Sequence, residues 1–138
     1  MTKPPPEPAD PETRQRGTIL IADDGADNRV ILERLLQLSH FDTLVAENGD
    51  EAVTMASSHR PDLILMDLAM PKTDGWEATR RIKADAALRH IPIIAVTGHV
   101  TADEIERATE AGCSDVLAKP IVYEDLVRIV RENLVTSP

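Results

Sequence analysis

Short apolar segments rich in β-branched residues alternate along this chain with longer segments of helical periodicity, and no other property of the sequence limits the possible folds so strongly. The short segments have the length and composition of buried strands, and they cover residues 18–23, 42–46, 62–67, 92–97 and 114–119. Strict alternation predicts parallel strands, because each right-handed crossover must carry a helix over the sheet. We therefore predict an α/β fold: a doubly wound five-stranded parallel sheet with five helices.

The helical segments are predicted from the spacing of their apolar residues. Three of them cover residues 49–59, 75–87 and 101–111. The last helix, 123–134, is expected to turn four side chains inward: Leu126, Val127, Ile129 and Val130. The first helix is expected to have an apolar stripe made of Val30, Ile31, Leu35, Leu36 and Leu38, and a face toward water made of Asp27, Arg29, Glu33 and Arg34.

Composition narrows the class of partner. The chain has 24 acidic and 15 basic residues, a net charge of -9, whereas nucleic-acid binding needs Lys and Arg to neutralise phosphates. Cys113 is the single cysteine, so no internal disulfide forms, and no apolar run approaches the roughly 20 residues that cross a bilayer. We expect a cytoplasmic protein that binds proteins or cations, with no nucleic acid and no membrane.

The N-terminal region differs in composition from the rest of the chain. Residues 1–16 hold five of the ten prolines and almost no apolar side chains, so they cannot bury enough surface to offset the entropy of ordering. We predict a disordered Pro-rich tail over 1–16, with a polyproline docking motif as the alternative. Residues 17–138 are predicted to form one domain.

Polar side chains end four of the five predicted strands: Asp23 with Asp24, then Asp67, Thr97 and Lys119. In an open α/β sheet, ligands bind beyond the carboxyl ends of the strands. Three carboxylates at that edge require a cation, and oxygen ligands favour a hard ion such as Mg²⁺. With a lysine and a hydroxyl nearby, the set could bind the oxygens of a transferring phosphoryl group, and one carboxylate could be the nucleophile.

Taken in order, these residues and their neighbours resemble the receiver domain of two-component response regulators. The motifs are Asp23-Asp24, the run Leu-Ile-Leu-Met-Asp67 with Met70-Pro71 and Asp74-Gly75 after it, Ala95-Val96-Thr97-Gly98, and Lys119-Pro120. The resemblance covers about residues 17–135 and is closest in kind to chemotaxis regulators. It implies a flavodoxin-like fold with strand order 2-1-3-4-5 and a stand-alone, single-domain response regulator.

The resemblance also implies a site. Asp67 would be the phosphoacceptor, receiving a phosphoryl group from a phosphohistidine on a sensor histidine kinase or a histidine phosphotransfer protein. Asp24, Asp67 and the backbone carbonyl of Ala69 would hold Mg²⁺ directly, with Asp23 acting mainly through water. Mn²⁺ would substitute for Mg²⁺. Such a domain is not an enzyme acting on other molecules, and it catalyses only its own phosphorylation and slow dephosphorylation.

Further roles follow from the same resemblance. Lys119 would contact one phosphoryl oxygen, Thr97 would reorient to bind another, and the Lys119-Pro120 peptide would be cis. The output would reach a downstream protein through the fourth helix, the fifth strand and the fifth helix, residues 101–111, 114–119 and 123–134.

Three positions near the implied site bear on how it works. Gly98 fits the family, because a larger side chain beside Thr97 would crowd the site. Val116 stands where many members have a Tyr or Phe that acts as a rotating switch with Thr97. Ala69 stands where many members have a polar side chain, which bears on the lifetime of the phosphoryl group.

Three other classes of function compete with this interpretation. An acid-dehalogenase-type phosphatase also uses a strand-end aspartate with Mg²⁺. That class has an Asp-x-Asp pattern whose second acid protonates the leaving group, and this chain has Ala69 in the place of the second acid. A flavin carrier would need a phosphate-accepting turn after the first strand, where Asp23 and Asp24 would repel a phosphate. A degenerate receiver used only as a docking module would be expected to have lost part of the site.

Overall fold

Five parallel strands form one sheet whose order differs from their order along the chain. The computed structural model describes residues 17–70 and 73–135, so the predicted tail, 1–16, lies outside the described residues. The strands are β1 (Thr18–Ala22), β2 (Asp42–Ala46), β3 (Leu63–Asp67), β4 (Ile93–Thr97) and β5 (Asp115–Ala118). Their order across the sheet is β2-β1-β3-β4-β5, with every neighbouring pair parallel, as predicted.

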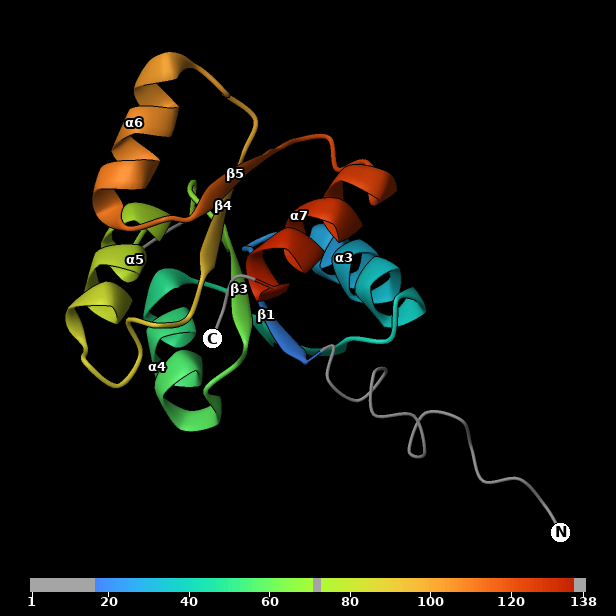
Figure 1. Cartoon of the computed structure of the whole chain (residues 1–138), viewed down its shortest axis with the longest axis horizontal. Helices are drawn as coiled ribbons and strands as arrows, with labels where there is room; N and C mark the ends of the chain where they lie inside the picture. The colour runs from blue at the N-terminus through green and yellow to red at the C-terminus, as the bar shows by residue number, and fades with distance from the viewer. Residues whose placement is uncertain (1–16, 71–72, 136–138) are drawn as a thin grey trace, which may run out of the picture.

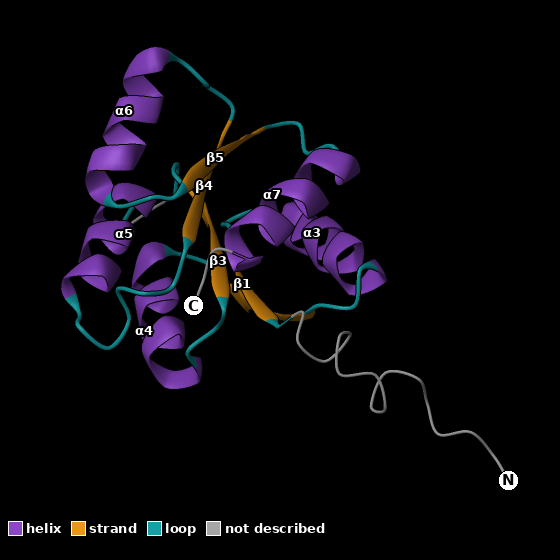
Figure 2. Ribbon diagram, viewed as in Figure 1, coloured by secondary structure: helices purple, strands orange, loops and turns teal. Residues whose placement is uncertain are grey.

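The helices cover both faces of this sheet. They are α3 (Ala26–Leu38), α4 (Gly49–His59), α5 (Gly75–Ala84), α6 (Ala102–Ala111) and α7 (Tyr123–Val135). Figure 1 shows α4, α5 and α6 on one side of the strands and α3 and α7 on the other, and Figure 2 shows the strands running between these two groups. The predicted doubly wound architecture is confirmed. Within the described ranges, no helix is both long enough and apolar enough to cross a membrane.

The central strand β3 is buried on both faces, and its side chains alternate between two hydrophobic layers. Leu63 and Leu65 pack in the layer under α3 and α7, whereas Ile64 and Met66 pack in the layer under α4, α5 and α6. This alternation is the period-two geometry of a strand between two helical layers. The same alternation sets the direction of the side chain of Asp67, the last residue of β3.

The first helix turns a different face to the core from the one that the sequence predicts. Its fully buried residues are Leu32 and Leu36, which are four apart. Val30, Ile31 and Leu38 are instead 53%, 52% and 69% exposed, so the predicted stripe is wrong for these three side chains. An apolar patch on α3 therefore faces solvent.

Two residues of α3 that were expected to face water are partly buried. The side chain of Arg29 is 15% exposed, and its Nη1 donates a hydrogen bond of 2.7 Å to the backbone oxygen of Asp23. Glu33 is half-buried and accepts a hydrogen bond from the Thr43 hydroxyl on β2. The predicted inward residues of α7 are all buried, which confirms that assignment: Leu126, Val127, Ile129 and Val130.

The start of α5 lies against the end of β3 because residue 75 is a glycine. A Cβ atom at Gly75 would lie 2.3 Å from the backbone oxygen of Asp67, so no side chain fits there. Asp74 caps the helix, since its carboxylate accepts a hydrogen bond from the Glu77 N–H. The helix ends at Ala84, three residues before the predicted end, because Asp85 adopts an extended backbone (ψ 117°).

Helices α5 and α6 are also joined through an aromatic ring. Trp76, the only tryptophan of the chain, is 8% exposed and packs in the layer under α4, α5 and α6. The guanidinium carbon of Arg107 on α6 lies 4.2 Å from the centroid of this ring, a cation–π contact. The environment of Trp76 therefore depends on the position of α6.

Candidate functional site

The predicted site residues lie at one edge of the sheet. Asp67 and Thr97 are the last residues of β3 and β4, while Asp23 directly follows β1 and Lys119 directly follows β5. Asp23 and Lys119 were predicted as the ends of their strands, so each predicted strand is one residue too long there. Since β1, β3, β4 and β5 are successive neighbours in a parallel sheet, their carboxyl ends bring all four side chains to the same edge.

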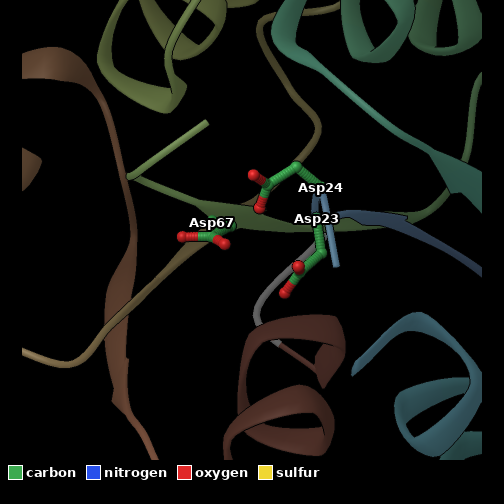
Figure 3. A group of neighbouring side chains, drawn as sticks. All are labelled: Asp23, Asp24 and Asp67. Atoms are coloured by element: carbon green, nitrogen blue, oxygen red, sulfur yellow. The ribbon is translucent and has the colours of Figure 1, made fainter. Parts of the chain in front are cut away.

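Three carboxylates meet at this edge. One oxygen each from Asp23, Asp24 and Asp67 lies within 4.8 Å of the other two. Figure 3 shows the three side chains as neighbours, Asp23 and Asp24 coming from the end of β1 and Asp67 from the end of β3. Asp23 and Asp67 are only 2% and 4% exposed, whereas Asp24 is open to solvent. The cluster therefore has a buried floor and one accessible carboxylate.

Local hydrogen bonds hold the two buried carboxylates in place. Asp23 Oδ1 accepts a hydrogen bond of 2.8 Å from the Gly25 N–H, and Asp67 Oδ1 accepts one of 3.0 Å from the Ala69 N–H. The Oδ2 atoms of both residues face the ammonium of Lys119, at 3.9 Å for Asp23 and 3.1 Å for Asp67. One backbone donor and one shared cation thus orient each carboxylate.

The surroundings of Asp67 act on its pKa in opposite directions. Burial raises the pKa of this carboxyl above its ordinary value, and the charge of Asp23 acts in the same direction. The Ala69 N–H and the Lys119 ammonium lower the pKa of Asp67, because both favour its ionised form. Burial is the largest of these effects, and it disfavours the ionised form of Asp67. A cation bound at the cluster would favour the ionised form, which Asp67 needs as a nucleophile or as a ligand.

The donor set fits a hard divalent cation. In the part of the chain that the structure describes, the Asp24 carboxylate has no hydrogen-bond or ion-pair partner, although it lies beside two other carboxylates. Oxygen-only donors of this kind suit Mg²⁺, which takes one or two carboxylates and keeps several waters. Asp23, Asp24 and Asp67 are therefore the residues that could hold such an ion.

Thr97 lies beside the carboxylate cluster but is engaged elsewhere. Its side chain is 6% exposed, and its hydroxyl donates a hydrogen bond of 3.0 Å to Oε1 of Glu104 on α6. The same oxygen accepts a hydrogen bond of 3.0 Å from the His99 N–H. Both hydrogen-bonding directions of the hydroxyl are thus used within the β4–α6 connection.

The sequence interpretation missed Glu104. The segment Thr101-Ala-Asp-Glu104 has the spacing of a capping box, in which the glutamate turns back to the N–H of the capping threonine. The structure keeps half of that pattern, because Thr101 Oγ1 accepts a hydrogen bond from the Glu104 N–H. The Glu104 carboxylate turns to Thr97 instead, and only the folded arrangement reveals this.

The remaining predicted positions lie around the site. The Lys119-Pro120 peptide bond is cis. Ala69 is exposed, and its side chain offers no polar group. Val116 is half-buried on β5, packs against the layer under α4, α5 and α6, and pairs in register with Ala95 of β4. A Cβ atom at Gly98 would meet no atom within 4 Å in this structure.

A pocket of about 300 Å³ adjoins the carboxylate cluster on the α3 side. Its polar lining comes from Asp23 and Lys119, which belong to the site, and from Asn28. The rest of its lining is apolar and comes from α3, β4 and the segment after β5: Ile31, Leu32, Val96, Pro120 and Ile121. The site therefore opens toward the exposed apolar patch of α3.

A doubly wound sheet with an acidic cluster, a threonine and a lysine at the carboxyl ends of its strands defines the class of receiver domains. Comparison with protein families agrees: residues 19–131 match the model of the response regulator receiver domain, and the chain belongs to this family. Its place in two-component signalling follows from the family, which confirms the resemblance seen in the sequence.

Curated relatives and solved structures are similar over nearly the whole described chain. The polar-differentiation response regulator DivK of Brucella anthropi is 37% identical over 117 residues, 85% of this chain and 95% of that protein. The signal receiver domain of a signal transduction histidine kinase from Syntrophus aciditrophicus is 34% identical with a TM-score of 0.80, covering 86% of this chain and 90% of that one.

A further solved structure contains an ion. The receiver domain of sensor histidine kinase PA1611 from Pseudomonas aeruginosa PAO1 has a magnesium ion coordinated in its active site cleft. It is 34% identical to this chain, with a TM-score of 0.81, and the match covers 87% of this chain and 98% of that one.

Proposed function

We propose that this receiver domain accepts a phosphoryl group from a phosphohistidine onto Asp67 in a Mg²⁺-dependent reaction and thereby switches a protein-binding surface. The observation that carries the proposal is the meeting of three carboxylates within 4.8 Å at the strand ends, with the Lys119 ammonium 3.1 Å from Asp67. A cluster of this kind binds a cation and a phosphoryl group together, because each offsets the charge of the other.

The reaction forms an acyl phosphate. A carboxylate oxygen of Asp67 attacks the phosphorus, the N–P bond of the phosphohistidine breaks, and its electron pair returns to the imidazole nitrogen of the donor protein. Lys119 then exchanges part of its contact with Asp67 for a contact with a phosphoryl oxygen. Thr97 turns its hydroxyl from Glu104 to another phosphoryl oxygen. The domain thus transfers one group to itself and turns over no small substrate.

Asp24, Asp67 and the backbone carbonyl of Ala69 are the proposed direct Mg²⁺ ligands, with Asp23 acting mainly through water. When bound, the ion offsets the negative charge of the phosphoryl oxygens. Mn²⁺ is proposed to substitute, since it also accepts oxygen ligands. The magnesium ion in the cleft of the Pseudomonas aeruginosa receiver domain, 34% identical to this chain, supports this assignment.

The phosphodonor is proposed to be a sensor histidine kinase or a histidine phosphotransfer protein that docks on α3. Val30, Ile31 and Leu38 expose 53%, 52% and 69% of their surface there. Ile31 also lines the pocket that opens beside Asp23 and Lys119. Exposed apolar side chains gathered on one helix typically mark a protein–protein interface, and the pocket that Ile31 lines also holds Asp23 and Lys119, the neighbours of Asp67.

The output surface is proposed to be the face made by α6, β5 and α7, through which the domain would bind a downstream protein. α6 carries Glu104, the partner of the Thr97 hydroxyl, so it is directly joined to the site. Exposed apolar side chains lie on and next to this face: Val100, Ile105, Val122 and Tyr123. A protein contact there would sense the state of Thr97.

The competing functions lack support at specific positions. A phosphatase of the acid-dehalogenase type needs a second acid two residues after the nucleophile, where this chain has the methyl group of Ala69. A degenerate docking module would lack part of the site, whereas Asp23, Asp67 and Lys119 are mutually oriented by hydrogen bonds and ion pairs.

The proposal is tested with acetyl phosphate, a small-molecule phosphodonor, and intact-mass measurement. With Mg²⁺, the wild-type protein is expected to gain one phosphoryl group, and with a chelator none. Asp67→Asn is expected to gain none while keeping the wild-type circular dichroism spectrum. The matched control is Asp62→Asn, at an exposed aspartate that directly precedes β3, at the opposite end of the strand from Asp67. Full labelling of Asp67→Asn would exclude Asp67 as the acceptor.

A further inference from the structure

The Thr97 hydroxyl has a single proton, and in this structure that proton is committed to Glu104. The distance from Thr97 Oγ1 to Glu104 Oε1 is 3.0 Å, and Thr97 is 6% exposed, so water competes weakly for the bond. A hydroxyl donates only one hydrogen bond at a time. Thr97 therefore cannot donate to Glu104 and to a phosphoryl oxygen in the same state.

The β4–α6 connection holds Glu104 in position for this contact. The Thr101 N–H donates a hydrogen bond of 3.1 Å to the His99 backbone oxygen, which closes a tight turn after β4. Thr101 Oγ1 accepts a hydrogen bond of 3.1 Å from the Glu104 N–H, which starts α6 at that turn. The His99 N–H in turn bonds to Thr97 Oγ1. Three hydrogen bonds donated by backbone N–H groups thus hold the first turn of α6 next to the end of β4.

We propose that Glu104 is a positioning residue that opposes phosphorylation by holding the Thr97 hydroxyl away from the phosphoryl site. The inference rests on the proposed function, since it concerns the same hydroxyl. Phosphorylation then exchanges one charged acceptor for another, the Glu104 carboxylate for a phosphoryl oxygen. The free energy gained when Thr97 binds the phosphoryl oxygen is therefore reduced by the free energy of the Thr97–Glu104 hydrogen bond, which has to break first.

The competition also couples the site to α6. When Thr97 turns to the phosphoryl group, the first turn of α6 loses its side-chain bond to β4. A partner that binds α6 only in the released position is favoured by the phosphoryl group. By linkage, the partner strengthens phosphoryl binding by the factor by which the phosphoryl group strengthens partner binding. Glu104 therefore sets how strongly the output surface and the phosphorylation site influence each other.

The test uses beryllofluoride with Mg²⁺, a stable mimic of the phosphoryl group, and calorimetric measurement of its dissociation constant. Glu104→Asp keeps the negative charge at the start of α6 but shortens the side chain by one methylene, so the carboxylate no longer reaches Thr97. Its affinity for beryllofluoride is expected to rise about tenfold, which corresponds to about 1.4 kcal/mol. Glu104→Gln keeps an oxygen that accepts the bond but removes the charge that strengthens it, so its affinity is expected to rise by less than that of Glu104→Asp, by about threefold.

The Thr97→Val background separates the proposed contact from any general effect on α6. Valine keeps the branched shape of threonine without the hydroxyl, so nothing remains for Glu104 to hold. In Thr97→Val, the further change Glu104→Asp is expected to leave the affinity unchanged. Circular dichroism of each variant checks that α6 still forms.

Two results would overturn the role of Glu104. One is an unchanged affinity in Glu104→Asp. The other is a tenfold gain that persists in Thr97→Val, because the effect would then not pass through the hydroxyl. If the wild-type protein itself binds no beryllofluoride and takes no label from acetyl phosphate, the proposed function fails instead, so the two failures are distinguishable.

Discussion

The Lys119 ammonium lies 3.1 Å from Asp67 Oδ2, although the two residues are 52 positions apart in the sequence. The parallel order of the sheet places β4 between their strands, and only the side chains cross the gap. The same ammonium is 3.9 Å from Asp23 Oδ2. One cation thus offsets the charge of two buried carboxylates, and it stands where a phosphoryl group on Asp67 would project.

Replacing this cation is expected to slow phosphorylation. Lys119→Gln removes the charge that stabilises the developing phosphoryl oxygens, so labelling of Asp67 by acetyl phosphate should slow by about 100-fold. Lys119→Arg retains the charge and should lose much less. The measurement is the rate of mass gain at fixed Mg²⁺. Equal rates for Lys119→Gln and wild type would show that Lys119 only balances the resting carboxylates.

Magnesium is expected to stabilise the fold through Asp24. At about ten times its dissociation constant, bound Mg²⁺ should raise the free energy of unfolding by about 1.4 kcal/mol, or the melting temperature by about 5 °C. Asp24→Asn should lose most of this gain, because it removes the accessible carboxylate of the cluster. The control is Asp27→Asn, at an exposed aspartate in the first turn of α3. Equal losses in both variants would indicate non-specific cation binding.

The lifetime of the phosphoryl group is expected to depend on residue 69. The methyl group of Ala69 cannot hydrogen-bond a water aligned on the acyl phosphate, so Ala69→Asn should speed hydrolysis by roughly tenfold, for one positioning bond of about 1.4 kcal/mol. Decay of the phosphorylated mass after removal of acetyl phosphate gives the rate. Ala69→Val adds bulk without a polar group and is the matched control. An unchanged rate in Ala69→Asn would mean that residue 69 does not limit hydrolysis.

The conformational response is expected to concentrate at the start of α6. Val116 is too short to act as an aromatic lever, and its β-branch restricts its rotation. Beryllofluoride with Mg²⁺ should therefore shift the amide NMR signals of residues 98–105 strongly and those of residues 115–117 weakly. Large shifts at 115–117 with small ones at 98–105 would mean that β5 carries the response instead.

The fold was predictable because its determinants are local and repeated. Each strand is a short apolar run between helical segments. A continuous apolar run such as Leu63 to Met66 is typical of a central strand that is covered on both faces. The strand ends Asp67 and Thr97 were then predictable as neighbours, because parallel strands share one carboxyl edge. The candidate site residues were read from the ends of the predicted strands, whereas the order of the strands came from the resemblance to receiver domains.

Two features were not predictable, for different physical reasons. The inward face of α3 depends on the angle at which the helix meets the sheet, and the apolar residues Val30, Ile31 and Leu38 face solvent because Leu32 and Leu36 face the sheet. The carboxylate of Glu104 has two acceptable partners, the N–H of its own capping residue and the Thr97 hydroxyl. Sequence spacing describes only the first of these partners.

The cation–π contact between Arg107 and Trp76 gives this protein a built-in optical probe. Arg107 lies one turn beyond Glu104 on α6, so a displacement of that helix changes the field at the only indole in the chain. Tryptophan emission can therefore follow the helix in real time without an attached dye. A stopped-flow trace would then time the structural response separately from the chemistry at Asp67.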